Sequence, residues 1–346
     1  LIAHMLPVGL PLADPKLIGK HVEDFVHSHH ATNASIYADW LGADLSGKNL
    51  DGANLQGAFL DGANLQGASL IGANLENATL VGANLSNTNF TRANLKGVNL
   101  GHSHLHNTKL CGANLEEVIF DKAHLDGLDC QSANMTKASF LSIQCNSANF
   151  TNANLSYSKW TGINMDADLE KISTKIPSVD DIILPMEIGG INFTGANLSF
   201  AIMLGCTAKK GIRMAKVNFS KASLQRCRFI EGDFSGAQFI STNVVLGSTM
   251  KKSNFESAKI SACFFHGANL SQSNFHLASL DKTNFSLANM ANCSLIQVSA
   301  AGSHFERANL LDATFLSSKM VGAIFRNASL TGTCFDDCDL THSDFS

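Results

Sequence analysis

Residues 52–56 read Gly-Ala-Asn-Leu-Gln, and residues 72–76 read Gly-Ala-Asn-Leu-Glu. The same five-residue unit continues without a break from residue 43 to residue 165, with a large apolar residue or Cys at each centre. Sixteen of these 25 centres are Leu, and the residue two places before the centre is Ala in 15 units. A period of five fits neither the turn of a helix nor the alternation of a strand. It therefore predicts a repeat with its own geometry.

Each unit has two inward positions, because residues two places apart can point to the same side of an extended backbone. The other positions are mostly Asn, Asp, Ser, Thr, Gly, Gln or Lys, which suit turns and solvent. One short edge and one corner per unit close a square after four units, so about 20 residues make a coil, and coils stack at ~4.8 Å. The central residue then fills the axis, and the Ala beside it has to be small.

This pattern resembles that of the pentapeptide-repeat family over most of the chain. The resemblance implies an all-β solenoid, a right-handed quadrilateral β-helix in which each coil is stabilised mainly by its neighbours. A middle block continues the spacing from Phe219 to Val244, and a second long block runs from Met250 to Phe345. Because the step from Val244 to Met250 is six residues, we expect a bulge near 245–247.

The chain is predicted to contain a helical cap and two loop interruptions besides the repeats. Asp14-Pro15 suits a helix start, and apolar residues then recur at helical spacing. A second interruption is expected at 205–215, within the later repeats. The predicted segments are a short helical N-terminal cap at 1–42, a first β-helix block at 43–165, an inserted loop or short helix at 166–192, and a second β-helix block at 193–346.

The nine cysteines suggest a disulfide or metal framework, but the repeat register accounts for most of them. Six take inward positions, where a free Cys behaves as a small buried hydrophobe: Cys130, Cys145, Cys227, Cys263, Cys293 and Cys338. Cys111 and Cys334 take outward positions, and Cys206 lies in the expected interruption. Unpaired thiols fit a reducing cytosol, either bacterial or that of a host after secretion.

The charge balance is nearly even, with 25 basic and 29 acidic residues, a net charge of −4 and a pI of about 6.4. It predicts no direct nucleic-acid binding and no anionic-membrane surface. No run of about 18 apolar residues is present, so no membrane span is expected. The first residues lack the basic start and the cleavage site of a signal peptide. The chain does not begin with Met, so we expect an excised segment of a longer protein.

The best metal candidate is a patch of imidazoles with one carboxylate. In a coil of about 20 residues, His104 lies directly below His124 at strand spacing, and Asp126 lies above His106. Such side chains can ligate zinc. All are outward positions without a visible second shell, so stacked polar ladders are the simpler interpretation, and no metal or other cofactor is predicted.

No catalytic constellation is present in the sequence. It contains no Gly-rich phosphate loop, no nucleophile elbow and no paired carboxylates in an apolar setting, so no enzymatic activity is expected. Loops on a rigid scaffold are where recognition usually lies. The partner-binding candidates are therefore the two interruptions, with these residues: Ile182, Ile183, Lys209, Lys210, Arg213 and Lys216.

The leading functional hypothesis is a non-catalytic scaffold that presents loops and faces to a protein partner. Outward apolar residues support it, since Phe59, Val81, Ile119 and Leu141 fall on one face. Similar rods form the N-terminal part of some bacterial effector proteins, including ubiquitin ligases, so a targeting domain of a larger enzyme is one alternative. Another is a DNA-mimicking inhibitor or protector of gyrase, as in several pentapeptide-repeat proteins. A DNA mimic needs rows of acidic residues, and here only the last units are acidic.

The C-terminal coil also indicates a kind of partner. Phe335, Leu340 and Phe345 keep the spacing to the penultimate residue, and no cap follows. An exposed coil end recruits other chains. We therefore expect either a further C-terminal domain or an end-to-end homodimer through this coil.

Overall fold

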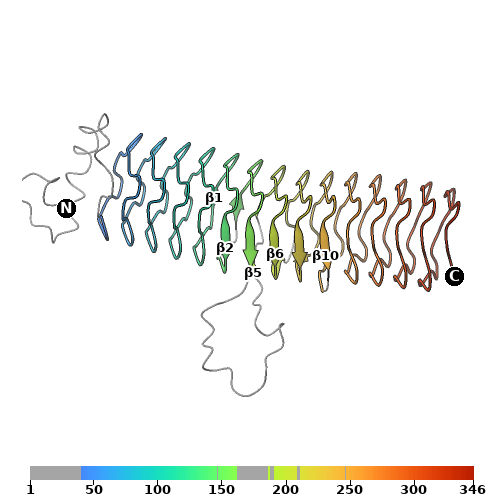
Figure 1. Ribbon diagram of the computed structural model, residues 1–346. Coiled ribbons are helices and arrows are strands. Elements are labelled where there is room, and N and C mark those ends of the chain that lie inside the picture. The colour runs from blue at the N-terminus through green and yellow to red at the C-terminus, as the bar shows by residue number, and fades with distance from the viewer. Residues whose placement is uncertain (1–39, 146, 162–185, 188–190, 209–210, 246) are drawn as a thin grey trace, which may run out of the picture. The chain divides into compact units, whose positions relative to one another are not determined.

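The computed structural model describes residues 40–346 except 146, 162–185, 188–190, 209–210 and 246. The chain divides into two compact units, Leu1–Asn154 (unit 1) and Leu155–Ser346 (unit 2). Each unit is a stack of short coils joined by corners, with the backbone of every coil running beside that of the next (Figure 1). The prediction of an all-β solenoid is confirmed.

The hydrogen bonds explain why five residues make one unit. In unit 1, Leu55 N–H donates to the carbonyl of Asn74 at 2.6 Å, and Asn74 N–H donates to the carbonyl of Ala53 at 2.8 Å. Ala53 N–H donates to the carbonyl of Leu50 at 3.1 Å, which closes the turn between two units. Each coil is thus tied to the next one 20 residues later, as the four-unit geometry predicted.

Most of the pairing consists of single bridges, because each straight edge is only two or three residues long. In unit 1 the named strands are β1 (Leu128–Asp129), β2 (Ser139–Leu141) and β3 (Ala148–Asn149), and β1 pairs with β3 in parallel. In the described part of unit 2 the named strands are β4 (Lys159–Thr161), β5 (Met186–Glu187), β6 (Ile202–Leu204), β7 (Cys206–Ala208), β8 (Ser223–Gln225), β9 (Arg228–Phe229) and β10 (Asn243–Val245). Their parallel pairings follow the orders β4-β6-β8-β10 and β5-β7-β9.

The axis of each unit is filled by the centre residues. Leu55 and its equivalents in unit 1 are fully buried. In unit 2 the centres are largely Phe, and rings of successive coils stack: Phe255 lies 4.9 Å from Phe234 and 4.8 Å from Phe275 between ring centroids. Such offset aromatic contacts add to the hydrophobic contribution of burial.

Inward Ser and Thr replace Ala at several small positions without leaving a polar group unsatisfied. Thr108 Oγ1 donates to the carbonyl of Leu85 at 2.7 Å, and Ser303 Oγ donates to the carbonyl of Leu280 at 2.7 Å. Buried hydroxyls are tolerated when they are hydrogen-bonded. The small inward position therefore accepts a hydroxyl, provided that the side chain remains short.

The corner residue two places after each centre adopts a left-handed backbone. Gly72, for example, has φ 66° and Asn77 has φ 58°. This conformation costs little for Gly and is more accessible to Asn than to other residues with a side chain. Several corners of unit 2 nevertheless carry large apolar residues, such as Phe200, Leu277 and Leu287.

The bulge predicted near 245–247 is confirmed. Val244 and Met250 are both buried centres, and the bridge between Arg228 and Thr249 spans 21 residues instead of 20. The centres on either side of the extra residue therefore remain inward.

The second predicted interruption, at 205–215, amounts to one coil of 21 residues, as the distance from Leu198 to Phe219 indicates, because Asn192 pairs with Arg213 and Asn197 with Asn218. Cys206, Ala208, Ile212 and Met214 are all buried at inward positions, and β7 belongs to this stretch. The sequence holds one extra residue between the buried positions Ala208 and Met214, which shifts the five-residue spacing. Lys209 and Lys210 lie outside the described residues.

The predicted cap and the first insertion fall mainly outside the description. Residues 1–39 and 162–185 are not described, so neither the helical cap nor the inserted loop or helix is tested. Trp40 already follows the repeat geometry, because its N–H donates to the carbonyl of Phe59 at 2.8 Å. At the other end of the insertion, β5 pairs with β7 and Ile191 is buried. Within the described ranges no helix occurs, and hence none that could cross a membrane.

Candidate functional site

The histidine patch forms the stack that the coil length predicts. His104 and His124 lie with ring centroids 4.8 Å apart and an angle of 24° between the rings. His106 and Asp126 are outward residues on the two coils concerned. Among the residues that the structure describes, no group of three or more His, Cys, Asp or Glu side chains is arranged to hold a metal ion. The patch therefore has the geometry of a polar ladder rather than a metal centre.

The asparagines before the centres form continuous side-chain ladders. Asn94 Nδ2 donates to Asn74 Oδ1 at 3.1 Å, and Asn114 Nδ2 donates to Asn94 Oδ1 at 3.0 Å. The same oxygen of Asn94 accepts the backbone N–H of Lys96 at 3.3 Å, as in an Asx turn. These amides are therefore engaged in the structure of the coils.

The cysteines are all free, and most are buried as the register predicts. Cys338 is only partly buried, because it lies in the final coil, which has a neighbouring coil on one side only. Cys206 is fully buried and not part of an irregular loop. Burial raises the pKa of Cys145 to about 12, so this thiol is held protonated and unreactive.

Cys111, although it points outward, is expected to react slowly with alkylating agents. Burial and its hydrogen bond to Asp129 raise its pKa to about 11, with Sγ 3.2 Å from Asp129 Oδ2. At pH 8 its iodoacetamide rate should be about a hundredfold below that of a cysteine in a peptide, because only the thiolate reacts. Asp129→Asn should raise the rate by removing the charge that favours the thiol. Mass spectrometry between pH 7 and pH 10 measures the alkylation rates of the unmodified chain and of the Asp129→Asn variant. A rate in the unmodified chain equal to that of a peptide cysteine would contradict the raised pKa of Cys111.

The predicted basic cluster is described only in part. Arg213 and Lys216 are exposed on one side of unit 2, and Arg213 lies in the bridge row between Asn192 and Asp233. Lys209 and Lys210, like Ile182 and Ile183, lie outside the described residues. The structure therefore places two of the six candidates on the surface and does not bring them into a pocket.

Two surface features of unit 2 were not anticipated. The first, called the aromatic corner, consists of Tyr157, Phe200 and Lys221 on three successive coils. The rings of Tyr157 and Phe200 are stacked, with centroids 4.6 Å apart and an angle of 6°. Lys221 Nζ lies 5.1 Å from the centroid of Phe200, a cation–π distance.

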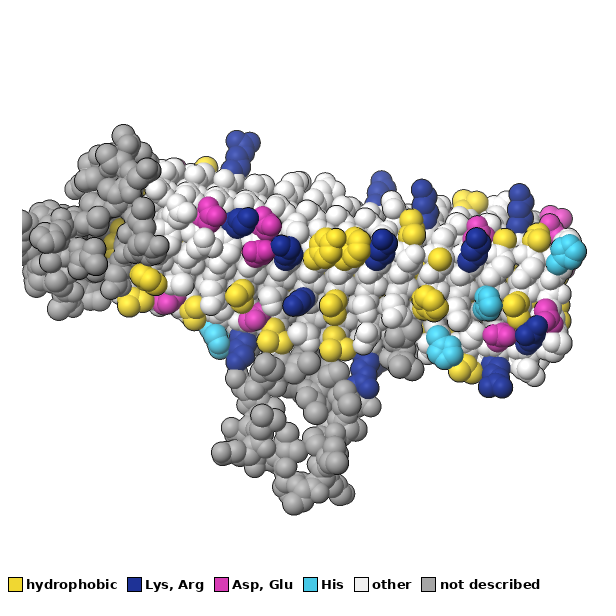
Figure 2. Space-filling view, viewed as in Figure 1, with side chains coloured by type: hydrophobic (Ala, Val, Ile, Leu, Met, Phe, Trp, Pro, Cys, Tyr) yellow, Lys and Arg dark blue, Asp and Glu magenta, His cyan; other side chains and the backbone are white. Residues whose placement is uncertain are grey.

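The aromatic corner is exposed although it is largely apolar. Tyr157 is 50% exposed and Phe200 is 39% exposed, and Ile202 in β6, two residues after Phe200, is 50% exposed. All three members of the corner have left-handed φ angles near 60°. On the face drawn in Figure 2, hydrophobic and basic side chains lie side by side in this manner. The corner thus presents rigid apolar surface to solvent at positions that most coils give to small or polar residues.

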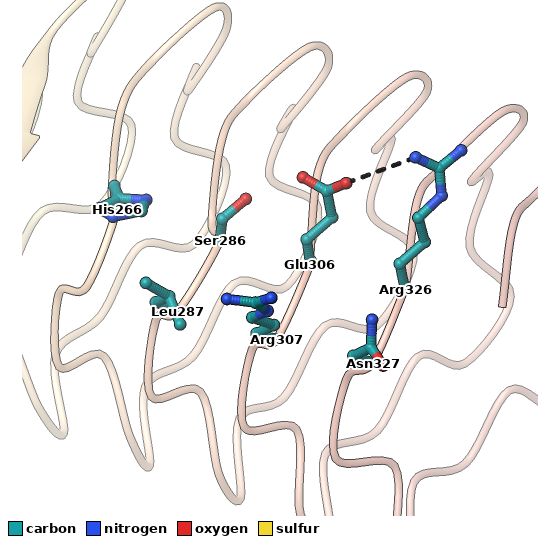
Figure 3. A pocket seen from close by; sticks show the side chains of 7 residues that line it. All are labelled: His266, Ser286, Leu287, Glu306, Arg307, Arg326 and Asn327. Atoms are coloured by element: carbon teal, nitrogen blue, oxygen red, sulfur yellow. Dashed lines mark ion pairs between the residues drawn. The ribbon is translucent and has the colours of Figure 1, made fainter. Parts of the chain in front are cut away.

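The second feature is a groove at another corner of unit 2, called the Arg307 groove, with a volume of about 340 Å³. One of its edges is formed by one residue from each of four successive coils, and each of these residues directly follows a centre: His266, Ser286, Glu306 and Arg326. The other edge is formed by their neighbours Leu287, Arg307 and Asn327. Figure 3 shows these side chains converging from consecutive coils, with Arg307 beside Leu287.

Most charges around this groove are paired. Arg326 Nη1 lies 3.8 Å from Glu306 Oε1, and Arg326 Nε donates to Asp344 Oδ2 at 2.6 Å. The backbone N–H and side chain of Ser346, together with the Arg326 guanidinium, lower the pKa of Asp344 to about 2. His304 Nδ1 lies 4.0 Å from the other oxygen of Glu306. The groove therefore has two guanidinium groups and one carboxylate in its lining, and the carboxylate faces Arg326 (Figure 3).

Comparison with known proteins agrees with this architecture. A family model described as pentapeptide repeats matches residues 36–67, 68–107, 103–140, 211–244 and 250–286, and a second pentapeptide-repeat model matches 300–344. The first model alone matches more than half of the chain, so the chain belongs to the pentapeptide-repeat family. Proteins of this family are generally non-catalytic.

Solved structures give more distant matches. HetL, a pentapeptide repeat protein involved in heterocyst differentiation regulation in Nostoc sp. strain PCC 7120, is 18% identical over 77% of this chain and 96% of its own, with a TM-score of 0.23. Full-length QnrB1, a plasmid-mediated fluoroquinolone resistance protein, is 17% identical over 74% of this chain and 93% of its own, with a TM-score of 0.20. A thylakoid-lumen pentapeptide repeat protein of Arabidopsis thaliana is 28% identical over 31% of this chain and 64% of its own, with a TM-score of 0.18. No curated protein matches the chain.

Proposed function

We propose that this β-helix is a non-catalytic protein–protein interaction scaffold and that the aromatic corner of unit 2 is a surface at which it binds a protein partner. The observation that carries the proposal is the exposed, stacked pair Tyr157 and Phe200 at left-handed backbone positions. Aromatic residues, Tyr in particular, are enriched where protein surfaces bind one another.

The backbone conformation argues against a purely structural role for this pair. A residue with a side chain costs roughly 1–2 kcal/mol more than Gly in the left-handed region, whereas an aromatic contact contributes about 0.5–1.5 kcal/mol beyond its burial. Since Gly occupies the same position at many other corners, such as Gly236 and Gly302, folding alone does not require aromatic rings here. A protein partner that covers the two rings supplies the favourable free energy that folding alone does not.

Site-specific photocrosslinking tests this function. With p-benzoylphenylalanine in place of Phe200, irradiation in an extract of the source organism should give a discrete crosslinked protein. The same probe in place of Ala262, an exposed residue at the equivalent corner position of another coil, should not. Equal products at both sites, or none at Phe200, would remove the basis of the proposal.

A second variant separates binding from folding. Tyr157→Gly combined with Phe200→Gly should change the free energy of unfolding by only about 1 kcal/mol, because relief of the left-handed strain offsets the lost stacking. The partner identified by the crosslink should bind this variant at least about tenfold more weakly, since buried aromatic contacts dominate many interfaces. Circular dichroism in urea and a pull-down with the purified partner measure the two quantities.

Other functions have less support. A DNA mimic needs uncompensated acidic rows, whereas Glu116 and Glu117 face Lys96 and Lys137 at 3.1 and 2.7 Å in unit 1. Inhibition of gyrase supercoiling by the purified chain would nevertheless favour that alternative. The comparisons give no support to an effector or ligase-targeting role, which stays a prediction of the sequence, as do the reducing cytosol and the end-to-end homodimer or further C-terminal domain.

A further inference from the structure

The Arg307 groove presents two polar groups that have no partner among the residues that the structure describes. Arg307 is exposed, and no ion-pair or side-chain hydrogen-bond partner for it is found among the residues described. Ser286 is only 8% exposed, and its backbone N–H donates to Asn284 Oδ1 at 2.8 Å. Within the same described part, its hydroxyl has no hydrogen-bond partner. The Ser286 oxygen is not among the fully buried atoms that lack a partner, so it is open to the groove and can hydrogen-bond a group that enters it.

Within the described ranges, the neighbouring charges pair with one another and leave Arg307 without an ion-pair partner. Arg326 is held by Asp344 and Glu306, and Glu306 faces both Arg326 and His304. None of these pairs involves Arg307, which projects from the adjacent corner row beside Leu287 (Figure 3). Uncompensated positive charge therefore lies next to exposed apolar surface, since Leu287 is 50% exposed.

We propose that the Arg307 groove binds an acidic peptide segment, with a carboxylate of the peptide on Arg307 and Ser286 and an adjacent apolar side chain on Leu287. The planar guanidinium donates two parallel hydrogen bonds to a carboxylate, and the Ser286 hydroxyl donates a further one. The volume of about 340 Å³ accommodates a side chain and part of its neighbour. This site lies on a different corner from Tyr157 and Phe200 and does not depend on the function proposed for them.

The test uses two capped dipeptides, acetyl-Leu-Glu-amide and acetyl-Leu-Gln-amide, titrated into the full chain labelled with ¹⁵N. The Nε–H signal of Arg307, identified by its loss in Arg307→Gln, should shift saturably with the glutamate peptide. The glutamine peptide should bind about fivefold or more weakly, as should the glutamate peptide to Arg307→Gln, because a charged hydrogen bond is lost.

Matched variants control for overall charge and apolar surface. Arg92 is an exposed arginine at a left-handed corner of unit 1, with φ 61°, and Arg92→Gln should leave the affinity unchanged. Leu277 has the same exposure, 50%, and the same φ, 59°, as Leu287. Leu287→Ser should weaken binding about threefold or more through lost apolar contact, whereas Leu277→Ser should not.

Several outcomes would overturn the proposal. Equal affinity for the two peptides would show that the carboxylate is not recognised. Equal effects of Arg92→Gln and Arg307→Gln would show that the peptide is attracted by overall charge and not by this groove. If Arg307→Gln abolishes concentration-dependent self-association in analytical ultracentrifugation while the free peptide does not bind, the occupant is a second copy of this chain instead. Because Phe200→Gly leaves the groove intact, its peptide affinity should equal that of the unmodified chain.

Discussion

Phe265→Ala should lower the free energy of unfolding by about 3–5 kcal/mol, whereas Phe264→Ala, one residue earlier, should change it by no more than about 0.5 kcal/mol. Phe265 is a fully buried centre, and its ring lies 5.4 Å from that of Phe285. Phe264 is 52% exposed on the outer side of the same edge. The two variants remove the same atoms from the same coil, so the difference isolates burial on the axis.

Urea unfolding followed by circular dichroism measures both free energies, with one precaution. In a solenoid each coil is stabilised by its neighbours, so a cavity can unfold nearby coils before the rest. Hydrogen exchange should show lost protection first at the amides paired across this coil, such as Phe265 N–H with the carbonyl of Asn284. Equal destabilisation by the two variants would contradict the inward and outward assignment of these residues.

Ala73→Leu should destabilise unit 1 by about 3 kcal/mol or more, at the upper end of the range for overpacking. Ala73 is fully buried, and its backbone is fixed by hydrogen bonds to Leu70 at 3.1 Å and to Asn94 at 2.8 Å. The interior cannot widen without breaking those bonds, because the spacing between coils is set by the backbone pairing.

Ala73→Ser is the matched control and should cost only about 1 kcal/mol or less. The equivalent Thr88 Oγ1 donates to the carbonyl of Leu65 at 2.7 Å, so a hydroxyl at this position finds a partner. Thermal and urea unfolding of both variants give the comparison. A leucine variant as stable as the serine variant would mean that the interior of unit 1 is less closely packed than its buried alanines indicate.

The repeat itself could be predicted because every inward position is specified by residue type. Leu55 and Ala53 identify a unit without any long-range information, and the coil length then placed His104 over His124 correctly. Between Cys206 and Met214 the sequence indicated the extra residue but not which side chains stay inward, because one added residue moves the following positions out of the five-residue spacing.

The two candidate surfaces could not be found by the same reasoning. Tyr157 and Phe200 stack although 43 positions separate them, and the intervening segment hides the register that joins them. In the Arg307 groove each residue occupies an ordinary turn position. Only the stacking of the coils shows that Arg326 has two acidic partners while Arg307 has none among the residues described. Residue type predicts what lies inside this fold, whereas the outer surface depends on which corners coincide.

Because some coils have 21 residues, a fixed offset of 20 positions does not identify stacked neighbours throughout this chain. In unit 1 a residue and its upper neighbour differ by 20, as Asn94 and Asn114 do, but Asn218 lies 21 positions after Asn197. One added residue thus changes the spacing, while the centres on either side of it stay buried. The position of a surface residue in such a protein is therefore defined by its corner and its coil. Two proteins of this kind can share a binding surface even where a residue-by-residue alignment does not pair the residues that form it.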